Sequence, residues 1–172
     1  MRATAIGVGK PDVLMRTGVY RWMPPLPATL GTEMIGTIAA LGDDVAARFP
    51  DRRVGAPVLV YHLRGGCYAE YAAVPAVDVT PLPAGIDLDH AVSIPNYQVA
   101  WASMYRAARG VDIRTVYING AAGGIASAVI QLGKVAGFKV IGGASSAEKC
   151  AFASDELRSR SFKVLSTRRF FC

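Results

Sequence analysis

The sequence has few residues of the kinds that bind metals or form disulfide bridges. Its 172 residues include three cysteines, Cys67, Cys150 and Cys172, and two histidines, His62 and His90, all far apart along the chain. A catalytic zinc ion needs three protein ligands, and structural zinc sites use closely spaced cysteines. Sparse, unpaired cysteines are typical of reduced proteins. We therefore expect no metal site, no disulfide framework and a cytoplasmic location.

The chain also lacks the usual signals for export or membrane insertion. Its first ten residues have no apolar core of a signal peptide. Residues 115–133 carry no charge and are numerous enough to cross a bilayer. However, Asn119 and Gln131 lie within this run and its centre is rich in glycine, which favours a buried strand, turn and helix. We do not expect a membrane partner.

Acidic residues are absent after Glu156, so the basic character of the chain is concentrated at its end. The formal net charge is +6, and basic and acidic residues nearly balance before residue 157. The final segment contains Arg158, Arg160, Lys163, Arg168 and Arg169, with Phe162, Phe170 and Phe171 between them. Interleaved cations and aromatics keep nucleic-acid or membrane binding by this tail as an alternative, although we do not favour it.

Apolar and small residues dominate the remainder, and 52% of the chain is hydrophobic, which predicts a packed globular core. Short strands are predicted within 34–42, 52–61 and 65–75, separated by glycine and proline, whereas 11–33 reads as irregular. This pattern indicates a compact, barrel-like β unit.

The pattern changes to helical after Asp87, which can cap a helix that runs to about Ala108 with a kink at Pro95. Beyond Gly110 the order becomes strand, helix, strand, helix, with the first helix over 123–136 and the second over 147–157. This order is typical of a parallel βαβ unit.

The sequence NGAAGGIA, residues 119–126, forms the turn between the first strand and helix of that unit. Gly120, Gly123 and Gly124 allow a tight turn, and Ala126 replaces a third glycine with the next smallest residue. Such a turn points the free N–H groups of the helix at one spot, which suits a pyrophosphate. The alternative is a tight helix-strand contact without any ligand.

The second strand is followed by SSAEK, residues 145–149, with no carboxylate before Glu148. NAD sites usually place an acidic residue there for the ribose 2′-hydroxyl. Ser145, Ser146 and Lys149 instead offer two hydroxyls and a cation, which suit a 2′-phosphate and favour NADPH over NADH. Alternatively, Ser146 only caps the next helix while Lys149 is solvated.

Four stretches together resemble one known family: 12–36, 65–76, 96–101 and 116–149. The chain resembles the medium-chain dehydrogenase/reductase superfamily, in its zinc-free quinone oxidoreductase (zeta-crystallin-like) branch. The resemblance implies an α/β protein in which a partial GroES-like β-rich domain is followed by the first βαβ unit of a Rossmann domain. It further implies NADPH as cofactor and hydride transfer to a quinone or an activated alkene.

The resemblance also implies roles for particular residues, although it assigns no catalytic one. The cofactor-binding residues would be Gly120, Ala121, Ala122, Gly123, Gly124, Ile125, Ala126, Ser145, Ser146 and Lys149. Tyr20 would line the substrate cleft, and Asn96 would lie near the nicotinamide unless it merely caps a helix. Zinc-dependent members have a histidine where Thr32 stands here.

The implied domains are a partial GroES-like domain at 1–85, a connecting helix at 86–112, a partial Rossmann domain at 113–156 and an atypical basic tail at 157–172. Only two strands of a six-stranded Rossmann sheet are predicted, and members begin with a further hairpin. We therefore expect a chain truncated at both ends, with little activity and a tendency to form oligomers. The alternatives are a non-catalytic nucleotide-binding fragment and an inactive gene remnant.

Overall fold

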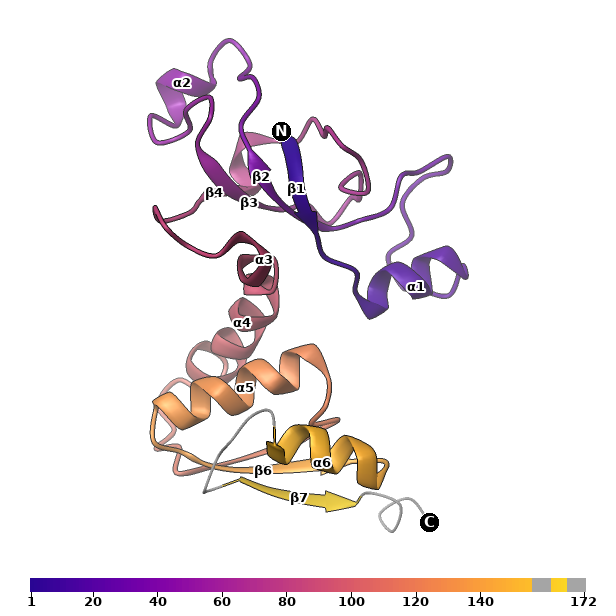
Figure 1. The fold of residues 1–172 in the computed structure, drawn as a ribbon, viewed down its shortest axis with the longest axis vertical. Coiled ribbons are helices and arrows are strands. Elements are labelled where there is room, and N and C mark those ends of the chain that lie inside the picture. Colours follow the sequence, from indigo (N-terminus) through magenta and orange to yellow (C-terminus); the bar gives the residue numbers. More distant parts are fainter. Residues whose placement is uncertain (156–161, 167–172) are drawn as a thin grey trace. The chain divides into compact units, whose positions relative to one another are not determined.

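The computed structural model describes residues 1–155 and 162–166, and the chain divides into two compact units (Figure 1). Unit 1 comprises Met1–Pro95 and unit 2 comprises Asn96–Cys172. The division falls inside the segment 86–112, for which the sequence predicts a connecting helix. Each unit is described below by itself.

Unit 1 is built on an antiparallel four-stranded sheet. Its strands follow the order β1-β2-β3-β4, with β1 at Arg2–Ile6, β2 at Glu33–Thr37, β3 at Pro57–Tyr61 and β4 at Val79–Pro81. β2 pairs with β3 over its whole length, from Glu33 opposite Tyr61 to Thr37 opposite Pro57. The predicted β-rich character of this part of the chain is confirmed.

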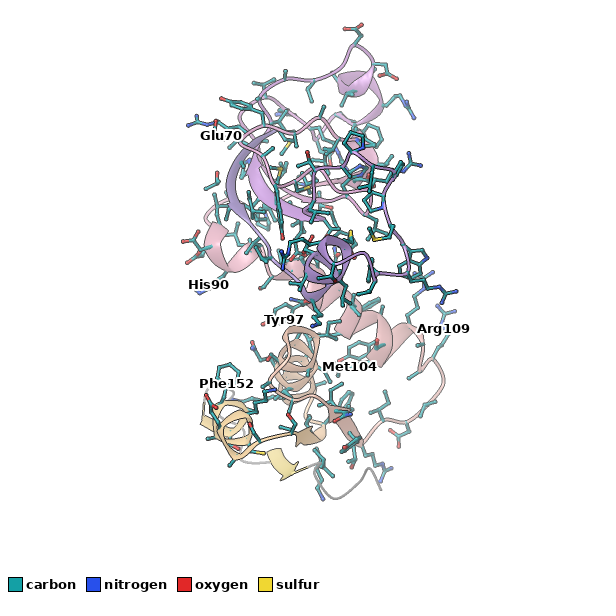
Figure 2. The ribbon with its side chains drawn as sticks, turned by 90° about the vertical axis from the view of Figure 1, so that its right-hand side faces the viewer. Glu70, His90, Tyr97, Met104, Arg109 and Phe152 are labelled. Atoms are coloured by element: carbon teal, nitrogen blue, oxygen red, sulfur yellow. The ribbon has the colours of Figure 1, made fainter. Side chains whose placement is uncertain are left out.

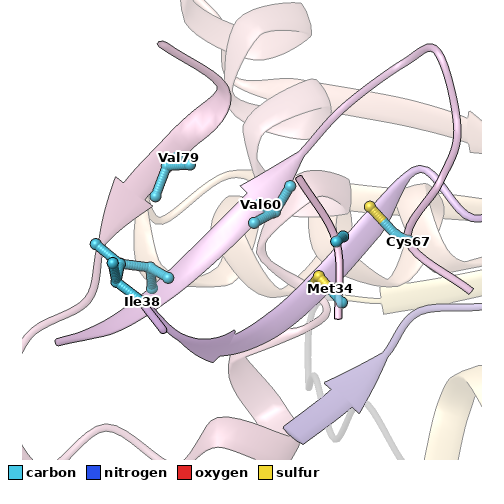
Figure 3. Close-up of a cluster of buried hydrophobic side chains, with 7 residues drawn as sticks. Met34, Ile38, Val60, Cys67 and Val79 are labelled. Atoms are coloured by element: carbon cyan, nitrogen blue, oxygen red, sulfur yellow. The ribbon is translucent and has the colours of Figure 1, made fainter. Parts of the chain in front are cut away.

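Alternating side chains of the central strands enter two apolar clusters. Met34 and Val60 pack with Cys67 on one face of the sheet (Figure 3). Ile35 and Leu59 pack with Ala91 on the other. Successive residues of a strand point to opposite faces, so β2 and β3 are buried on both sides.

Two segments of unit 1 differ from their predicted structure. Lys10–Arg16, predicted to be irregular, forms helix α1, because Pro11 fits the first turn and the Asp12 carboxylate accepts a hydrogen bond from the Gly9 N–H at 2.9 Å. The strand predicted within 65–75 is reduced to one isolated bridge, between Arg2 and Tyr71. Gly65 has φ of 87° and Gly66 has φ of 95°, which turn the chain out of an extended path.

A further short helix in unit 1, α2, covers Val45–Arg48. The helical segment after Asp87 begins as predicted, because the Asp87 carboxylate accepts hydrogen bonds from the N–H groups of Asp89 and His90. It is divided into α3 at Leu88–Ala91 and α4 at Ile94–Trp101, followed by a π-helical turn at Ala102–Arg106.

Unit 2 contains a parallel sheet with the strand order β5-β6-β7. β5 covers Thr115–Asn119, β6 covers Lys139–Ala144 and β7 covers Phe162–Ser166. Helices α5, Gly124–Val135, and α6, Ala147–Asp155, make the two crossovers and lie on the same side of the sheet (Figure 1). The predicted strand-helix-strand-helix order is confirmed.

The expectation of two parallel strands is wrong, because β7 adds a third. It pairs in parallel with β6, from Val140 opposite Phe162 to Ala144 opposite Ser166. Its sequence FKVLS has strand-forming residues, but the surrounding basic residues led this segment to be assigned to a tail. The rest of the predicted tail after Glu156, which carries most of the residues behind the alternative of nucleic-acid or membrane binding, lies outside the described residues.

Among the described helices, none combines the length and the apolar character needed to cross a bilayer. The uncharged run 115–133 is instead divided between β5, a turn and α5.

Candidate nucleotide-binding site

The carboxyl ends of β5 and β6 bring two predicted binding segments to one edge of the unit 2 sheet. Asn119, the last residue of β5, lies opposite Gly143 near the end of β6. The glycine loop follows β5 directly, and Ser145 follows β6. Ligands of parallel α/β sheets bind at this edge, beyond the carboxyl ends of the strands.

The glycine loop is held by hydrogen bonds from its own backbone. Gly120 has φ of 70°, in the left-handed region that favours glycine, and its N–H donates to Asn119 Oδ1 at 3.0 Å. The Ala121 N–H donates to the Gly143 carbonyl at 2.9 Å, which ties the loop to β6. The Gly123 N–H closes the turn on the Gly120 carbonyl at 2.8 Å.

Helix α5 begins without a side-chain cap. Gly123 is the N-cap residue and has extended backbone angles, and no side chain accepts a hydrogen bond from the first turn. The N–H groups of Gly124, Ile125 and Ala126 therefore have no partner within the helix. Gly124 and Ile125 are exposed, so their N–H groups are available to an anionic ligand. The cradle fits a pyrophosphate.

The opposite side of α5 fixes the helix in place. Ala126, the residue in the third glycine position, is buried, and Ala128, Val129 and Ile130 are buried after it. Ile130 packs with Val140 of β6, whereas Ala128 and Val129 pack with Ala100 and Met104 of the preceding helical segment. Met104 and Tyr97 are labelled on this segment in Figure 2.

Two contacts organise the segment after β6. Ser146 Oγ accepts a hydrogen bond from the Lys149 N–H at 3.3 Å, so Ser146 caps α6 as one alternative predicted. The Lys149 ammonium donates to Ser145 Oγ at 3.4 Å, although Ser145 and Lys149 are both exposed. The cation and the Ser145 hydroxyl are thus adjacent at the edge of the sheet that also carries the glycine loop.

Asn96 lies beside the glycine loop. Its Nδ2 atom is 2.9 Å, and its Cγ atom 3.3 Å, from the position that a Cβ at Gly124 would occupy. The neighbouring Tyr97 hydroxyl donates a hydrogen bond to Gln131 Oε1 of α5 at 2.8 Å, so this part of α4 is fixed to α5. The role implied for Asn96 near the nicotinamide stays a prediction.

Tyr20, the predicted substrate-cleft residue, lies in unit 1 after α1. Its ring meets that of Trp22 edge-on, with the centroids 5.9 Å apart, and Trp22 is 69% exposed. The arrangement offers aromatic surface, but no described contact assigns it to a substrate.

Unit 1 contains a buried carboxylate, Asp12, with the half-buried Glu33 and Tyr68 near it, which the sequence did not predict. Asp12 is 4% exposed and its Oδ1 atom has no partner among the described residues. Burial, followed by the nearby Asp12 charge, raises the pKa of Glu33. Burial also raises the pKa of Cys67 to about 11 and that of Tyr68 to about 12, with smaller contributions from the acids. The available signal in the sequence was the spacing of Gly9 and Asp12, which is typical of the start of a helix.

Within residues 1–155 and 162–166, no three His, Cys, Asp or Glu side chains gather in a way that could hold a metal ion. Thr32, for which the resemblance implies a histidine in zinc-dependent members, is buried in unit 1. The expectation that no metal takes part in the reaction stays a prediction.

Comparison with known proteins agrees with this fold. Residues 1–84 match the alcohol dehydrogenase GroES-like domain. Over 150 residues the chain is 33% identical to quinone oxidoreductase of Mus musculus, covering 86% of this chain and 44% of that protein. It is 31% identical to the synaptic vesicle membrane protein VAT-1 homolog of Homo sapiens, covering 87% of this chain and 37% of that protein.

Solved structures give the same result. Escherichia coli quinone oxidoreductase, solved in complex with NADPH, superposes with a TM-score of 0.84 at 26% identity, over 98% of this chain and 49% of that one. A mycobacterial protein complexed with NADPH gives a TM-score of 0.82 at 30% identity, over 96% of this chain and 49% of that one. The chain thus spans about half the length of these structures.

The fold and the matches define a chain with a GroES-like unit and the start of a Rossmann-type nucleotide-binding unit. The chain belongs to the medium-chain dehydrogenase/reductase superfamily, in which its similar proteins are quinone oxidoreductases and VAT-1 homologs.

Proposed function

We propose that this chain binds NADPH at the edge of the unit 2 sheet, as part of an oxidoreductase that reduces a quinone or an activated alkene. The observation that carries the proposal is the uncapped first turn of α5, which is exposed and directly follows the turn of residues 120–123. The NADPH complexes of two similar structures support the choice of cofactor. The similar quinone oxidoreductases support the substrate class.

The chain's own residues would bind and orient the cofactor. The N–H groups of Gly124, Ile125 and Ala126 would hold the pyrophosphate, and Lys149 with Ser145 would hold the 2′-phosphate. NADPH, when bound, supplies the hydride. Because the cofactor carries this chemistry, the protein needs no nucleophile or metal and contributes binding, orientation and electrostatics.

A second candidate is a nucleotide-binding chain with little catalysis of its own. The glycine loop and Lys149 favour it, because both are groups that bind a nucleotide and neither takes part in hydride transfer. NADPH oxidation with phenanthrenequinone separates the candidates. The second candidate predicts NADPH binding with slow turnover, and rapid turnover by this chain would contradict it.

The binding test uses two glycines that share a backbone conformation at opposite ends of α5. Gly120 has φ of 70° and Gly137 has φ of 76°, and a Cβ at either position would meet no atom within 4 Å. Alanine at either position should therefore cost a similar ~1–2 kcal/mol of folding free energy. Only Gly120 lies in the proposed binding loop. Calorimetric titration with NADPH should therefore show weaker binding for Gly120→Ala and wild-type binding for Gly137→Ala. Equal affinities for all three proteins would contradict the proposed site.

A further inference from the structure

Asn96 occupies a position on the ligand side of the glycine loop. In a helix the Cα–Cβ bond is tilted toward the N-terminus. The space that a Cβ at Gly124 would fill therefore lies toward the open end of α5, where the free N–H groups point. Asn96 Nδ2 lies 2.9 Å from the Cβ position, so the amide group stands beside those donors.

The position of Asn96 is fixed by its neighbours along the same helix. Tyr97 is hydrogen-bonded to Gln131 at 2.8 Å, and Ala100 and Met104 are buried against Ala128 and Val129 of α5. Contacts one, four and eight residues after Asn96 thus hold α4 and its π-helical continuation on α5. The amide is consequently placed with respect to the loop by packing, and not by a hydrogen bond of its own.

Within residues 1–155 the half-buried Asn96 side chain makes no described hydrogen bond. An amide has two N–H donors, and a donor next to a helix N-terminus adds to the field that attracts an anion. Glycine at position 124 keeps the space that this amide needs. A residue at position 96 that only filled the space beside Gly124 would not need a polar side chain.

We propose that Asn96 is a further binding residue of the nucleotide site, donating an Nδ2–H hydrogen bond to the pyrophosphate held by the first turn of α5. This inference rests on the proposed function and deepens it. It differs from the role implied by the family resemblance, which placed the Asn96 amide near the nicotinamide. Glycine at 124 and asparagine at 96 then form one functional pair.

The test compares two nucleotides that share the adenosine 2′-phosphate. NADPH contains the pyrophosphate, whereas adenosine 2′-monophosphate does not. Asn96→Ala should weaken NADPH binding about tenfold, the loss expected for one hydrogen bond to a charged group, and should leave adenosine 2′-monophosphate unchanged. Gln98→Ala, which removes an exposed amide two residues further along α4, should leave both affinities unchanged.

Asn96→Asp preserves the size of the side chain and serves if the alanine variant folds poorly. A carboxylate beside the pyrophosphate should weaken NADPH binding more than alanine does, because it adds repulsion. Wild-type NADPH affinity in Asn96→Asp, or an equal loss for both nucleotides in Asn96→Ala, would overturn the inference while leaving the site intact. If the wild-type chain binds neither nucleotide, the proposed function itself fails and the inference fails with it.

Discussion

The ammonium nitrogen of Lys149 lies 3.4 Å from the hydroxyl oxygen of Ser145, at the first turn of α6. Both residues are exposed beyond the end of β6, where a nucleotide ribose binds in parallel α/β sheets. The pair offers a cation and a hydroxyl to a phosphate, and the nearest carboxylate in the sequence is Glu148. The preference for NADPH can therefore be tested by a substitution of Lys149.

Lys149→Ala should weaken binding of adenosine 2′,5′-bisphosphate about tenfold, because the 2′-phosphate loses its cation. Binding of adenosine 5′-monophosphate, which lacks that phosphate, should not change. Lys139→Ala, at the start of β6, is the matched control. A titration in which Lys149→Ala weakens both nucleotides equally would show that the lysine does not select the 2′-phosphate.

Glu33→Gln should stabilise the protein at neutral pH. Burial and the Asp12 charge raise the pKa of Glu33 in the folded state, so the unfolded chain releases this proton first as pH rises. Stability therefore falls as pH rises from the ordinary glutamate pKa to the raised one. Glutamine removes this loss, and its advantage should disappear below about pH 4, where the carboxyl is protonated in both states.

Urea unfolding at neutral pH and below about pH 4 measures the stability gained by Glu33→Gln, with Glu70→Gln at an exposed position as control. A stability gain for Glu33→Gln that is the same at both pH values would mean that the carboxyl charge is not its cause.

Cys67 should resist alkylation in the folded protein. It is fully buried and its pKa is raised to about 11, so about one thiol in a thousand is ionised at pH 8. Cys150 on α6 is half-buried and should react with iodoacetamide first. Peptide mapping after timed alkylation distinguishes the two, and both should react in denaturant. Equal rates without denaturant would contradict the packing of unit 1.

Gly36→Ala should destabilise unit 1 by about 1–3 kcal/mol, the range found for added volume in packed interiors. A Cβ there would overlap the Arg2 carbonyl oxygen of the paired strand β1, which is backbone and cannot move aside. Gly42→Ala is the control, since the nearest atom to its Cβ is Val45 Cγ2 at 3.7 Å. If urea unfolding gives the same midpoint for both variants, the pairing of β1 with β2 is wrong.

Local signals in the sequence were sufficient for much of unit 2. The apolar run of β5, the glycines after it and the helical spacing of α5 are contiguous, so their order predicted the loop correctly. The helix cap at Asp87 was predicted for the same reason, because its hydrogen-bond donors lie two and three residues further along the chain. β7 was missed because the basic residues around FKVLS outweighed its strand-forming residues, and its pairing with β6 shows the strand directly.

The buried polar residues of unit 1 were missed for a similar reason. Asp12 of α1 lies near enough to Glu33 of β2 for its charge to raise the pKa of Glu33, and neither α1 nor this approach was predicted. The position of Asn96 against Gly124 likewise depends on how α4 packs on α5. Contacts between segments distant in sequence have no local pattern to reveal them.

The most direct test of the proposed nucleotide-binding site is to map NADPH binding on the amide groups of the chain by NMR. Shifts should be concentrated at residues 120–126, at residues 145–149 and at the Asn96 side-chain amide. Amides of the unit 1 strands β2 and β3 should change little. No shift at the glycine loop with millimolar NADPH would contradict the assignment of a nucleotide-binding site to this chain.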